Sequence, residues 1–354
     1  MSYDVGDGAV VQVIARTASI AIRTWNRSSV RMEWTDGAAF VPSRSRQEAR
    51  RSYLITSVSV QEERAPGEPA VTALLLPEDF PVPKVAPGKH DVVRIAQLSV
   101  PAQIGRPAPP ADLTVTIPET TGLVNIRSGR GTVTLTDYHG TTVAAAGRGR
   151  VNFNNVSGDA FVQPLNGDFY ALDSTFDRLR IRSNRGDEVF DACRVKQIDA
   201  TTLSGNIIFD NGIFDSGLAR FESVRGSIAI GVNGGAQLGA HTQDGQVLTA
   251  LPAAPPAPVL LGRSDADAVE VAGDGGPLVN AFTTHGNVLL YDGSLADRHP
   301  DDLSPPWRQM FGLFMNHRPA GHAEDAVARG RQFARTAAPQ TTPRRPAGFR
   351  GPSQ

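Results

Sequence analysis

The sequence contains few of the residues that support covalent cross-links or strong electrostatic binding. Its 354 residues include a single cysteine, Cys193, so an intramolecular disulfide is excluded. Lysine occurs only at Lys84, Lys89 and Lys196, and the formal net charge at pH 7 is -1. The overall charge therefore gives no argument for a nucleic-acid partner or a membrane surface.

Long apolar runs are also missing. The N-terminal residues 1–8 lack a basic segment followed by an apolar stretch, and no window of the chain approaches an uninterrupted apolar span. The sequence thus predicts neither a signal peptide nor an integral membrane segment. By default we expect a cytoplasmic protein, with export by another route left open.

Glycine, in contrast, recurs with a regular spacing. Each of these glycines is followed by alternating residues, most of them apolar, and the intervals are 18, 18, 19, 19, 21 and 19 residues. The glycines are Gly131, Gly149, Gly167, Gly186, Gly205, Gly226 and Gly245. Regular recurrence at this period is typical of coils that stack, so the repeat predicts an all-β fold built as a parallel β-solenoid.

Two apolar columns follow from lining up the glycines. Side chains two and four residues after each glycine point to the same side of a strand, and we expect them to stack inside the coil. The column at position two contains Val133, Val151, Phe169, Glu188, Ile207, Ile228 and Val247. A second strand is expected twelve residues after the glycine, with inward residues that include Val143, Phe161, Leu179 and Ile198.

The chain divides into four predicted segments. The proline-rich residues 105–110 are a plausible boundary, because proline cannot donate to a sheet ladder. We predict an N-terminal β-rich segment at 1–104, the solenoid at 111–300, a capping helix at 301–317 and a disordered basic tail at 318–354.

Within the N-terminal segment, residues 9–34 alternate like strands, and residues 42–52 are polar and predict a loop or a short helix. Further short strands are expected at 53–60, 71–76, 92–95 and 98–100.

The C-terminal part of the repeat is interrupted. Gly286 restores the motif 41 residues after Gly245, a gap that predicts two coils with a small insertion, and residues 252–258 are interpreted as a surface loop and not a domain boundary. Ser304 followed by Pro305 is typical of a helix start. We expect this helix to cover the apolar end that the last coil of a solenoid exposes.

Three stretches resemble the bacterial putative-adhesin family of β-solenoid domains. They are Leu203-Ser-Gly-Asn-Ile-Ile-Phe209, Ser223-Val-Arg-Gly-Ser-Ile-Ala-Ile230 and Ser19-Ile-Ala-Ile-Arg-Thr-Trp25. The resemblance implies an adhesin-like β-solenoid domain. It implies no substrate, cofactor or catalytic residue.

Glu188 is the one polar residue in the column at position two. One hypothesis places its carboxylate inside the stack, with a raised pKa and a role as acid or base beside Asp168 or Asp187. The alternative is a β-bulge at Asp187 that turns Val189 inward and leaves Glu188 in water. The bulge is favoured, because burying an unpaired carboxylate costs several kcal/mol.

Other polar residues predict little chemistry. His139, His241 and His285 are too dispersed for a metal-ligand spacing, and arginine occupies turns where a calcium-binding roll would need aspartate. Cys193 fits a small core position. We therefore expect no metal, no cofactor and no catalytic residue.

The sequence favours a non-enzymatic structural or interaction scaffold that presents a ladder face to a protein partner or to itself. The alternative is a carbohydrate-binding or carbohydrate-cleaving β-helix that uses Asp168, Asp187 and Glu188 on the solenoid face. The arginine-rich tail is interpreted as a solubilising end, with contact to an acidic partner or a membrane surface as the alternative.

Overall fold

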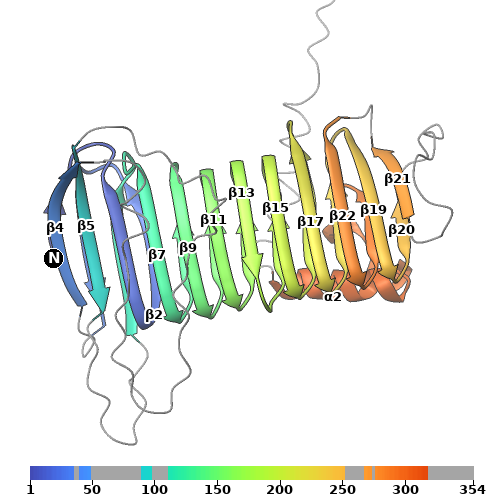
Figure 1. Ribbon diagram of the computed structural model, residues 1–354, viewed down its shortest axis with the longest axis horizontal. Helices are drawn as coiled ribbons and strands as arrows, with labels where there is room; N and C mark the ends of the chain where they lie inside the picture. The colour runs from blue at the N-terminus through green and yellow to red at the C-terminus, as the bar shows by residue number, and fades with distance from the viewer. Residues whose placement is uncertain (36–39, 49–88, 98–110, 252–266, 273–275, 318–354) are drawn as a thin grey trace, which may run out of the picture. The chain divides into compact units, whose positions relative to one another are not determined.

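The computed structural model describes residues 1–35, 40–48, 89–97, 111–251, 267–272 and 276–317. The chain forms two compact units, Met1–Phe314 and Met315–Gln354. The first unit is a stack of β-coils, in which each coil contributes one strand to sheet A and one to sheet B (Figure 1). The all-β parallel solenoid predicted from the glycine repeat is confirmed.

Sheet A contains the shorter strands of each coil. In spatial order they are β1 (Ser2–Asp4), β3 (Ser29–Trp34), β6 (Ala111–Pro118), the second half of β2 (Val10–Trp25), β8 (Val133–Thr136), β10 (Val151–Asn154), β12 (Phe169–Leu172), β14 (Glu188–Asp191), β16 (Ile207–Phe214), β18 (Ile228–Val232), β23 (Val288–Asp292) and β20 (Val247–Ala250).

Sheet B contains the longer strands, which lie side by side in Figure 1. In spatial order they are β4 (Phe40–Glu48), β5 (Lys89–Gln97), the first half of β2, β7 (Leu123–Arg130), β9 (Thr141–Arg148), β11 (Ser157–Asn166), β13 (Thr175–Ser183), β15 (Arg194–Ser204), β17 (Leu218–Arg225), β22 (Leu278–His285), β19 (Ala236–Asp244) and β21 (Asp267–Ala272).

Both ends of the stack depart from sequence order. Strand β2 pairs with β7 and β8 on one side and with β5 and β6 on the other, so the N-terminal segment is part of the stack. At the other end, β22 and β23 insert between the coil of β17 and β18 and the coil of β19 and β20. The prediction of two coils between Gly245 and Gly286 is therefore wrong: β21 turns back antiparallel to β19, and the coil of β22 and β23 pairs with the preceding face of β19 and β20.

The glycine column has a steric cause. A Cβ atom added at Gly167 would lie 1.9 Å from the carbonyl oxygen of Gly149 on the preceding coil. At Gly186, where φ is 128°, the same atom would lie 2.2 Å from the carbonyl oxygen of Gly167. The glycines thus allow successive backbones to approach at one corner of the coil, where any side chain would collide.

The core lies between the two sheets. Phenylalanine side chains stack along it, with ring centroids 5.3 Å apart for Phe153 and Phe169, 5.5 Å for Phe169 and Phe190, and 5.5 Å for Phe190 and Phe209. These residues are fully buried, as expected for the columns at positions two and four. Such aromatic contacts add about 0.5–1.5 kcal/mol per pair beyond the burial of apolar area.

The second apolar column is only partly as predicted. Leu179 and Ile198 face the core, but Val143 and Phe161 pair with Asn125 and Arg180 on the outward-facing side. The register between β11 and β13 skips Asp177 of β13, so the inward pairs are Ala160 with Leu179 and Val162 with Ile181. Spacing alone could not place that shift.

A separate apolar layer covers the outward-facing side of sheet A. Its C-terminal cover consists of the short helices η1 (Leu295–Asp297) and η2 (Pro300–Asp302) and the helix α2 (Pro305–His317). Trp307, Met310 and Phe314 pack against outward-facing residues of five strands, which are Tyr170, Leu172, Val189, Ile208, Ala229, Leu289 and Tyr291. The predicted helix is confirmed, but it runs along the flank of the stack and does not cover its end (Figure 1).

Several local predictions can be compared with the structure. The strand at 92–95 is confirmed as part of β5, whereas residues 42–48 belong to β4 and form neither loop nor helix. The strands predicted at 53–60, 71–76 and 98–100, the loop 252–258 and the tail 318–354 lie outside the described residues. Among those described, no helix has the length and apolar character needed to cross a bilayer.

Candidate functional site

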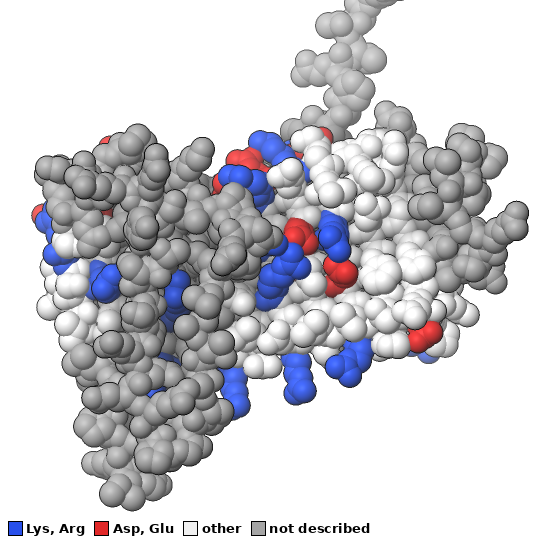
Figure 2. Space-filling view, in the orientation of Figure 1, with Lys and Arg blue, Asp and Glu red and all other residues white. Residues whose placement is uncertain are grey.

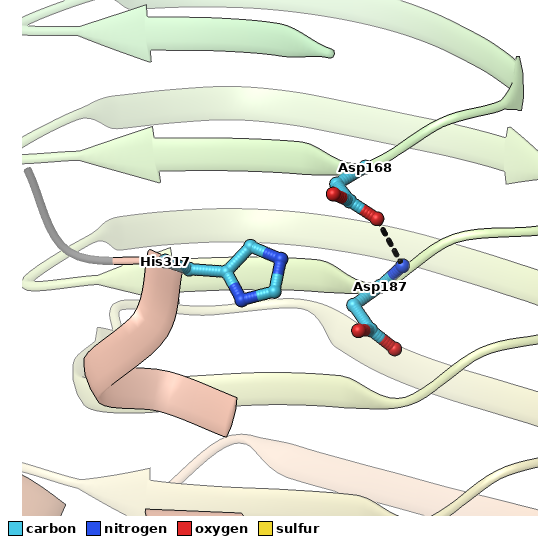
Figure 3. Close-up of side chains that lie close together, drawn as sticks. All are labelled: Asp168, Asp187 and His317. Atoms are coloured by element: carbon cyan, nitrogen blue, oxygen red, sulfur yellow. Dashed lines mark hydrogen bonds between the residues drawn. The ribbon is translucent and has the colours of Figure 1, made fainter. Parts of the chain in front are cut away.

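Asp168 and Asp187 belong to a hydrogen-bonded ladder that runs along the glycine corner. The main-chain N–H of Asp187 donates to Oδ1 of Asp168 at 3.1 Å, as Figure 3 shows, and the N–H of Asn206 donates to Oδ1 of Asp187 at 2.8 Å. The same contact continues from Ser227 to Asn206 at 2.9 Å and from Asn287 to Ser227 at 3.1 Å. Each polar side chain therefore binds the backbone of the next coil.

The ladder accounts for aspartate after glycine at these positions. Turn amides that leave the strand ladder need an acceptor, and a carboxylate or amide oxygen supplies one. Asp168 also accepts from Nη2 of Arg150 at 3.4 Å, and Asp187 from Nδ2 of Asn206 at 3.0 Å. Figure 3 also labels His317, which belongs to the second compact unit.

Glu188 lies inside the solenoid. It pairs in register with Phe169 on one side and Ile207 on the other, and its exposed fraction is 0%. The favoured prediction of a bulge that leaves Glu188 in water is wrong, since Val189 packs under the helix on the opposite side of the strand.

Glu188 can occupy the core because its carboxyl group keeps its proton there. Ser183 Oγ donates to Oε1 of Glu188 at 2.8 Å, while Oε2 is buried without a hydrogen-bond partner among the described residues. Burial raises the pKa of Glu188 to about 8, partly offset by the hydrogen bond from Ser183. At neutral pH the carboxyl group therefore keeps its proton, which avoids the cost of burying a charge.

The three proposed carboxyl groups are thus divided between two environments. Asp168 and Asp187 come together at the corner, whereas Glu188, although adjacent to Asp187 in sequence, faces the core. A general acid and base must both reach the same substrate atom or a water between them. The arrangement brings only the two ladder aspartates to one surface.

Asp210 is a buried carboxyl group that sequence reasoning missed. It lies under the C-terminal cover, where Tyr291 Oη donates to Oδ1 at 2.7 Å, Ser294 Oγ donates to Oδ2 at 2.5 Å and the N–H of Leu295 donates to Oδ1 at 2.7 Å. Burial, followed by the nearby Asp191, raises the pKa of Asp210 to about 7. The three hydrogen bonds attach the start of the cover to sheet A. Aspartate at the fifth position after Gly205 was the available sequence signal.

Cys193, His139, His241 and His285 lie in separate places in the described part of the solenoid. Cys193 is 1% exposed in the core, as predicted, and burial raises the pKa of its thiol, which lowers its reactivity. His139 contacts Ser157 Oγ at 2.7 Å, His241 stacks on Phe282, and His285 contacts Asp244 at 2.8 Å. These side chains have separate local partners.

The outward-facing side of sheet B carries an exposed apolar surface. Leu218 on β17 pairs with Leu278 on β22, and Phe282 on β22 pairs with His241 on β19. Leu218 is 50% exposed, Leu278 44% and Phe282 37%. We call these four residues the open face. Figure 2 shows this side of sheet B, with charged groups beside a region that is mostly uncharged.

Charged residues next to the open face are paired with one another. Arg220 contacts Glu222 at 2.7 Å, and Asp199 contacts Arg180 at 3.4 Å and Arg182 at 2.8 Å. These pairs lie on β17, which carries Leu218 of the open face, and on β13 and β15, the two strands before it in sheet B. The surface therefore combines apolar side chains with a nearly balanced set of charges.

Comparisons with solved structures and with curated proteins do not assign the chain to a family. A crystal structure titled as that of a "putative cell adhesion protein" from Clostridium sporogenes aligns with 9% sequence identity, 82% of this chain and 98% of that chain, at a TM-score of 0.26. That likeness supports no conclusion about this chain. No curated protein matches the sequence.

The family match, in contrast, covers the solenoid. Residues 110–290 match the Toastrack DUF4097 family, and this range includes the strands from β6 to β22 and the first part of β23. The match extends over half of the chain and agrees with the stacked β-coils of the structure. The chain therefore belongs to the Toastrack DUF4097 family.

Proposed function

We propose that the chain is a non-enzymatic interaction scaffold whose open face binds a second copy of the same chain. The observation that carries this proposal is the exposure of Leu218, Leu278 and Phe282 on neighbouring strands of a rigid sheet. Exposed apolar side chains grouped on one surface are typical of protein interfaces.

On the sheet A side of the same coils, the outward-facing apolar residues are covered by the chain itself. Leu289 and Tyr291 on β23 face outward from sheet A and are 0% exposed, because the C-terminal cover packs on them. The open face carries residues of similar size on the same coil. A second molecule would remove them from water in the same way, with a gain of about 25 cal/mol per Å² of apolar area.

Electrostatics favour a second copy over a strongly charged partner. The net charge of -1 creates no long-range repulsion between two copies. The charges beside the open face are paired within the sheet, so two copies related by a two-fold axis meet without a cluster of like charge.

The arrangement of strands favours contact between faces over strand addition. Strands β17, β22 and β19 lie within sheet B, where each already pairs on both sides. Their backbone groups are therefore not available to a third strand. A partner packs on the side chains, as in two sheets about 10 Å apart.

Sedimentation equilibrium over a range of concentrations tests this function. The wild-type chain of 37.7 kDa is expected to shift from one to two chain masses as concentration rises. Phe282→Glu should remain at one mass, because a charge on the interface would be desolvated on binding. Asn152→Glu, on the polar outward-facing side of sheet A, is the matched control and should associate like the wild type. A wild-type chain that stays at one mass at every concentration would overturn the proposal.

The carbohydrate alternative receives no support from the three carboxyl groups. The oxygens of Asp168 and Asp187 accept main-chain hydrogen bonds within the corner ladder, and Glu188 faces the core. Binding to a carbohydrate would have to use other residues of the surface.

A further inference from the structure

A row of arginines runs along the glycine corner, next to the ladder of polar side chains. Each arginine immediately precedes one of the repeat glycines. The arginines are Arg130, Arg148, Arg185 and Arg225, and Asn166 and Ser204 occupy the same position in the intervening coils. Arg130 pairs with Arg148, Asn166 pairs with both Arg148 and Arg185, and Ser204 pairs with Arg225. We call this set the arginine row.

The spacing of the row follows from the sheet. Neighbouring strands lie about 4.8 Å apart, so the first two arginines are about 5 Å apart along the stack and the next are about 10 Å apart. The corner glycines and the hydrogen-bonded ladder hold these backbones in a fixed register. Cationic groups with defined spacing therefore project from a rigid edge.

The arginines of the row differ from other arginines of the solenoid in their pairing. Arg178 contacts Asp159 at 2.6 Å, Arg194 contacts Asp215 at 2.8 Å and Arg220 contacts Glu222 at 2.7 Å. Within the part of the chain that the structure describes, no ion pair is recorded for the side chains of the arginine row, and all four are exposed. Figure 2 shows positively charged side chains that project along one edge of the stack.

The carboxylates nearest to the row in the sequence form hydrogen bonds within the ladder. Asp168 accepts from Arg150 and from the N–H of Asp187, and Asp187 accepts from Asn206. The guanidinium groups of the row keep their planar donor pairs for an external anion, and such pairs bind carboxylates with two parallel hydrogen bonds.

We propose that the arginine row binds an extended acidic polysaccharide that carries one carboxylate per sugar unit. A linear polyanion can meet several regularly spaced cations at once, which raises its affinity over that of a single sugar acid. Asn166 and Ser204, between the arginines, offer hydrogen bonds to sugar hydroxyl groups. The row contains no aromatic side chain, whereas proteins that bind single-stranded nucleic acid combine positive charge with aromatic platforms for the bases.

This site goes beyond the interaction of two copies. The arginine row lies at the glycine corner, whereas the open face lies on the outward-facing side of β17, β22 and β19. The two activities can therefore fail independently, and the binding experiment is done on Phe282→Glu as well as on the wild-type chain.

The test measures binding of the full chain to polygalacturonate by isothermal titration calorimetry at low and moderate salt. The triple variant Arg148→Gln, Arg185→Gln, Arg225→Gln is expected to bind at least about ten-fold more weakly and with a weaker salt dependence. The control variant Arg178→Gln, Arg194→Gln, Arg220→Gln changes the net charge equally but alters paired arginines, and it should bind within about two-fold of the wild type.

Two further ligands separate the proposed partner from other sources of binding. Dextran, which is neutral, should not bind, and single-stranded polythymidylate should bind at least about ten-fold more weakly than polygalacturonate. Unchanged thermal unfolding of both triple variants establishes that they are folded. Equal weakening in the two variants, equal affinity for polythymidylate, or no binding of polygalacturonate by the wild type would each overturn the proposal.

Discussion

Strands β22 and β23 belong to the same coil, yet the outward-facing residues of β23 are buried and those of β22 are exposed to solvent. On β23, Leu289 and Tyr291 are fully buried beneath the C-terminal cover. On β22, Leu278 and Phe282 are 44% and 37% exposed. The two sides of one coil thus differ in whether the chain itself returns to cover them, and the uncovered side is the one with apolar surface left for a partner.

On the covered side, the buried carboxyl group of Asp210 attaches the C-terminal cover to sheet A. Asp210 accepts hydrogen bonds from Tyr291, Ser294 and the N–H of Leu295, which attaches the cover where it leaves the last coil. The open face consists of side chains in a regular sheet. The comparison therefore predicts that residues of the core and of the covered side control stability, whereas residues of the open face control association.

The largest expected loss of stability comes from an acidic side chain introduced into the core between sheets A and B. Ile207 is fully buried between Glu188 and Ile228. Ile207→Asp should unfold the middle coils, because it removes a fully buried apolar side chain and buries a carboxyl group without a hydrogen-bond partner, at a cost of several kcal/mol. Urea denaturation followed by circular dichroism measures this. Leu203→Asp, at a position 50% exposed, is the control, and equal stability of the two variants would contradict the assignment of the core.

A second effect is a fall in stability with rising pH. Burial raises the pKa of Glu188 in the folded state from its ordinary value of 4.5 to about 8, so the folded state holds a proton that the unfolded state releases. The free energy of unfolding should therefore be highest below about pH 4.5 and fall as pH approaches 8, by at most about 5 kcal/mol. Asp210, with a pKa of about 7, contributes a slope of the same sign.

Glu188→Gln separates the two contributions. The variant should resemble the wild type in acid and be more stable at pH 9, with only the slope from Asp210 remaining. Urea unfolding at pH 5, 7 and 9 provides the comparison. A pH dependence identical to that of the wild type would show that Glu188 does not retain its proton in the fold.

Removing a side chain from the cover should have a smaller effect. Met310 is 1% exposed and packs on the apolar side of sheet A. Met310→Ala should lower the free energy of unfolding by about 2–5 kcal/mol, through lost contacts and a cavity. Met315→Ala, at an exposed position, is the matched control and should change stability by less than about 0.5 kcal/mol. If both variants lost the same amount, the helix would not act as a cover.

Much of the fold could be predicted because its constraints repeat. A Cβ atom is excluded at the same corner of each coil, and the inward positions two and four recur with it, so the glycine spacing indicated the solenoid. The order of the coils could not be derived in this way. Spacing counts coils, while the insertion of β22 and β23 depends on strand pairing between distant segments.

The polar residues were harder to place. Alternation put Glu188 in the core correctly, but the expected cost of a buried carboxylate favoured the bulge, and a carboxyl group that keeps its proton avoids that cost. The cover of sheet A had a visible signal, since Tyr170, Leu172 and Leu289 are apolar at outward-facing positions. The sequence alone could not show whether Asp168 and Asp187 serve the turns or line a groove, because an aspartate that follows a glycine fits either role.

The smallest expected change in stability concerns the open face itself. Leu278→Ser should alter the free energy of unfolding by less than about 0.5 kcal/mol, since the side chain is already 44% exposed. Thermal unfolding in dilute solution measures this value. A loss of several kcal/mol would mean that Leu278 supports the fold rather than an interface.

Chemical cross-linking tests the central claim, that a second copy binds the open face and not the polar outward-facing surface of β8 and β10 in sheet A. Asn280→Cys places a thiol on β22 between Leu278 and Phe282, and Thr134→Cys places one on the outward-facing side of sheet A. Native Cys193 is buried and should not react. With a short bismaleimide, Asn280→Cys should give a covalent dimer and Thr134→Cys should not. Dimers in equal yield from both variants, or from neither, would contradict the claim.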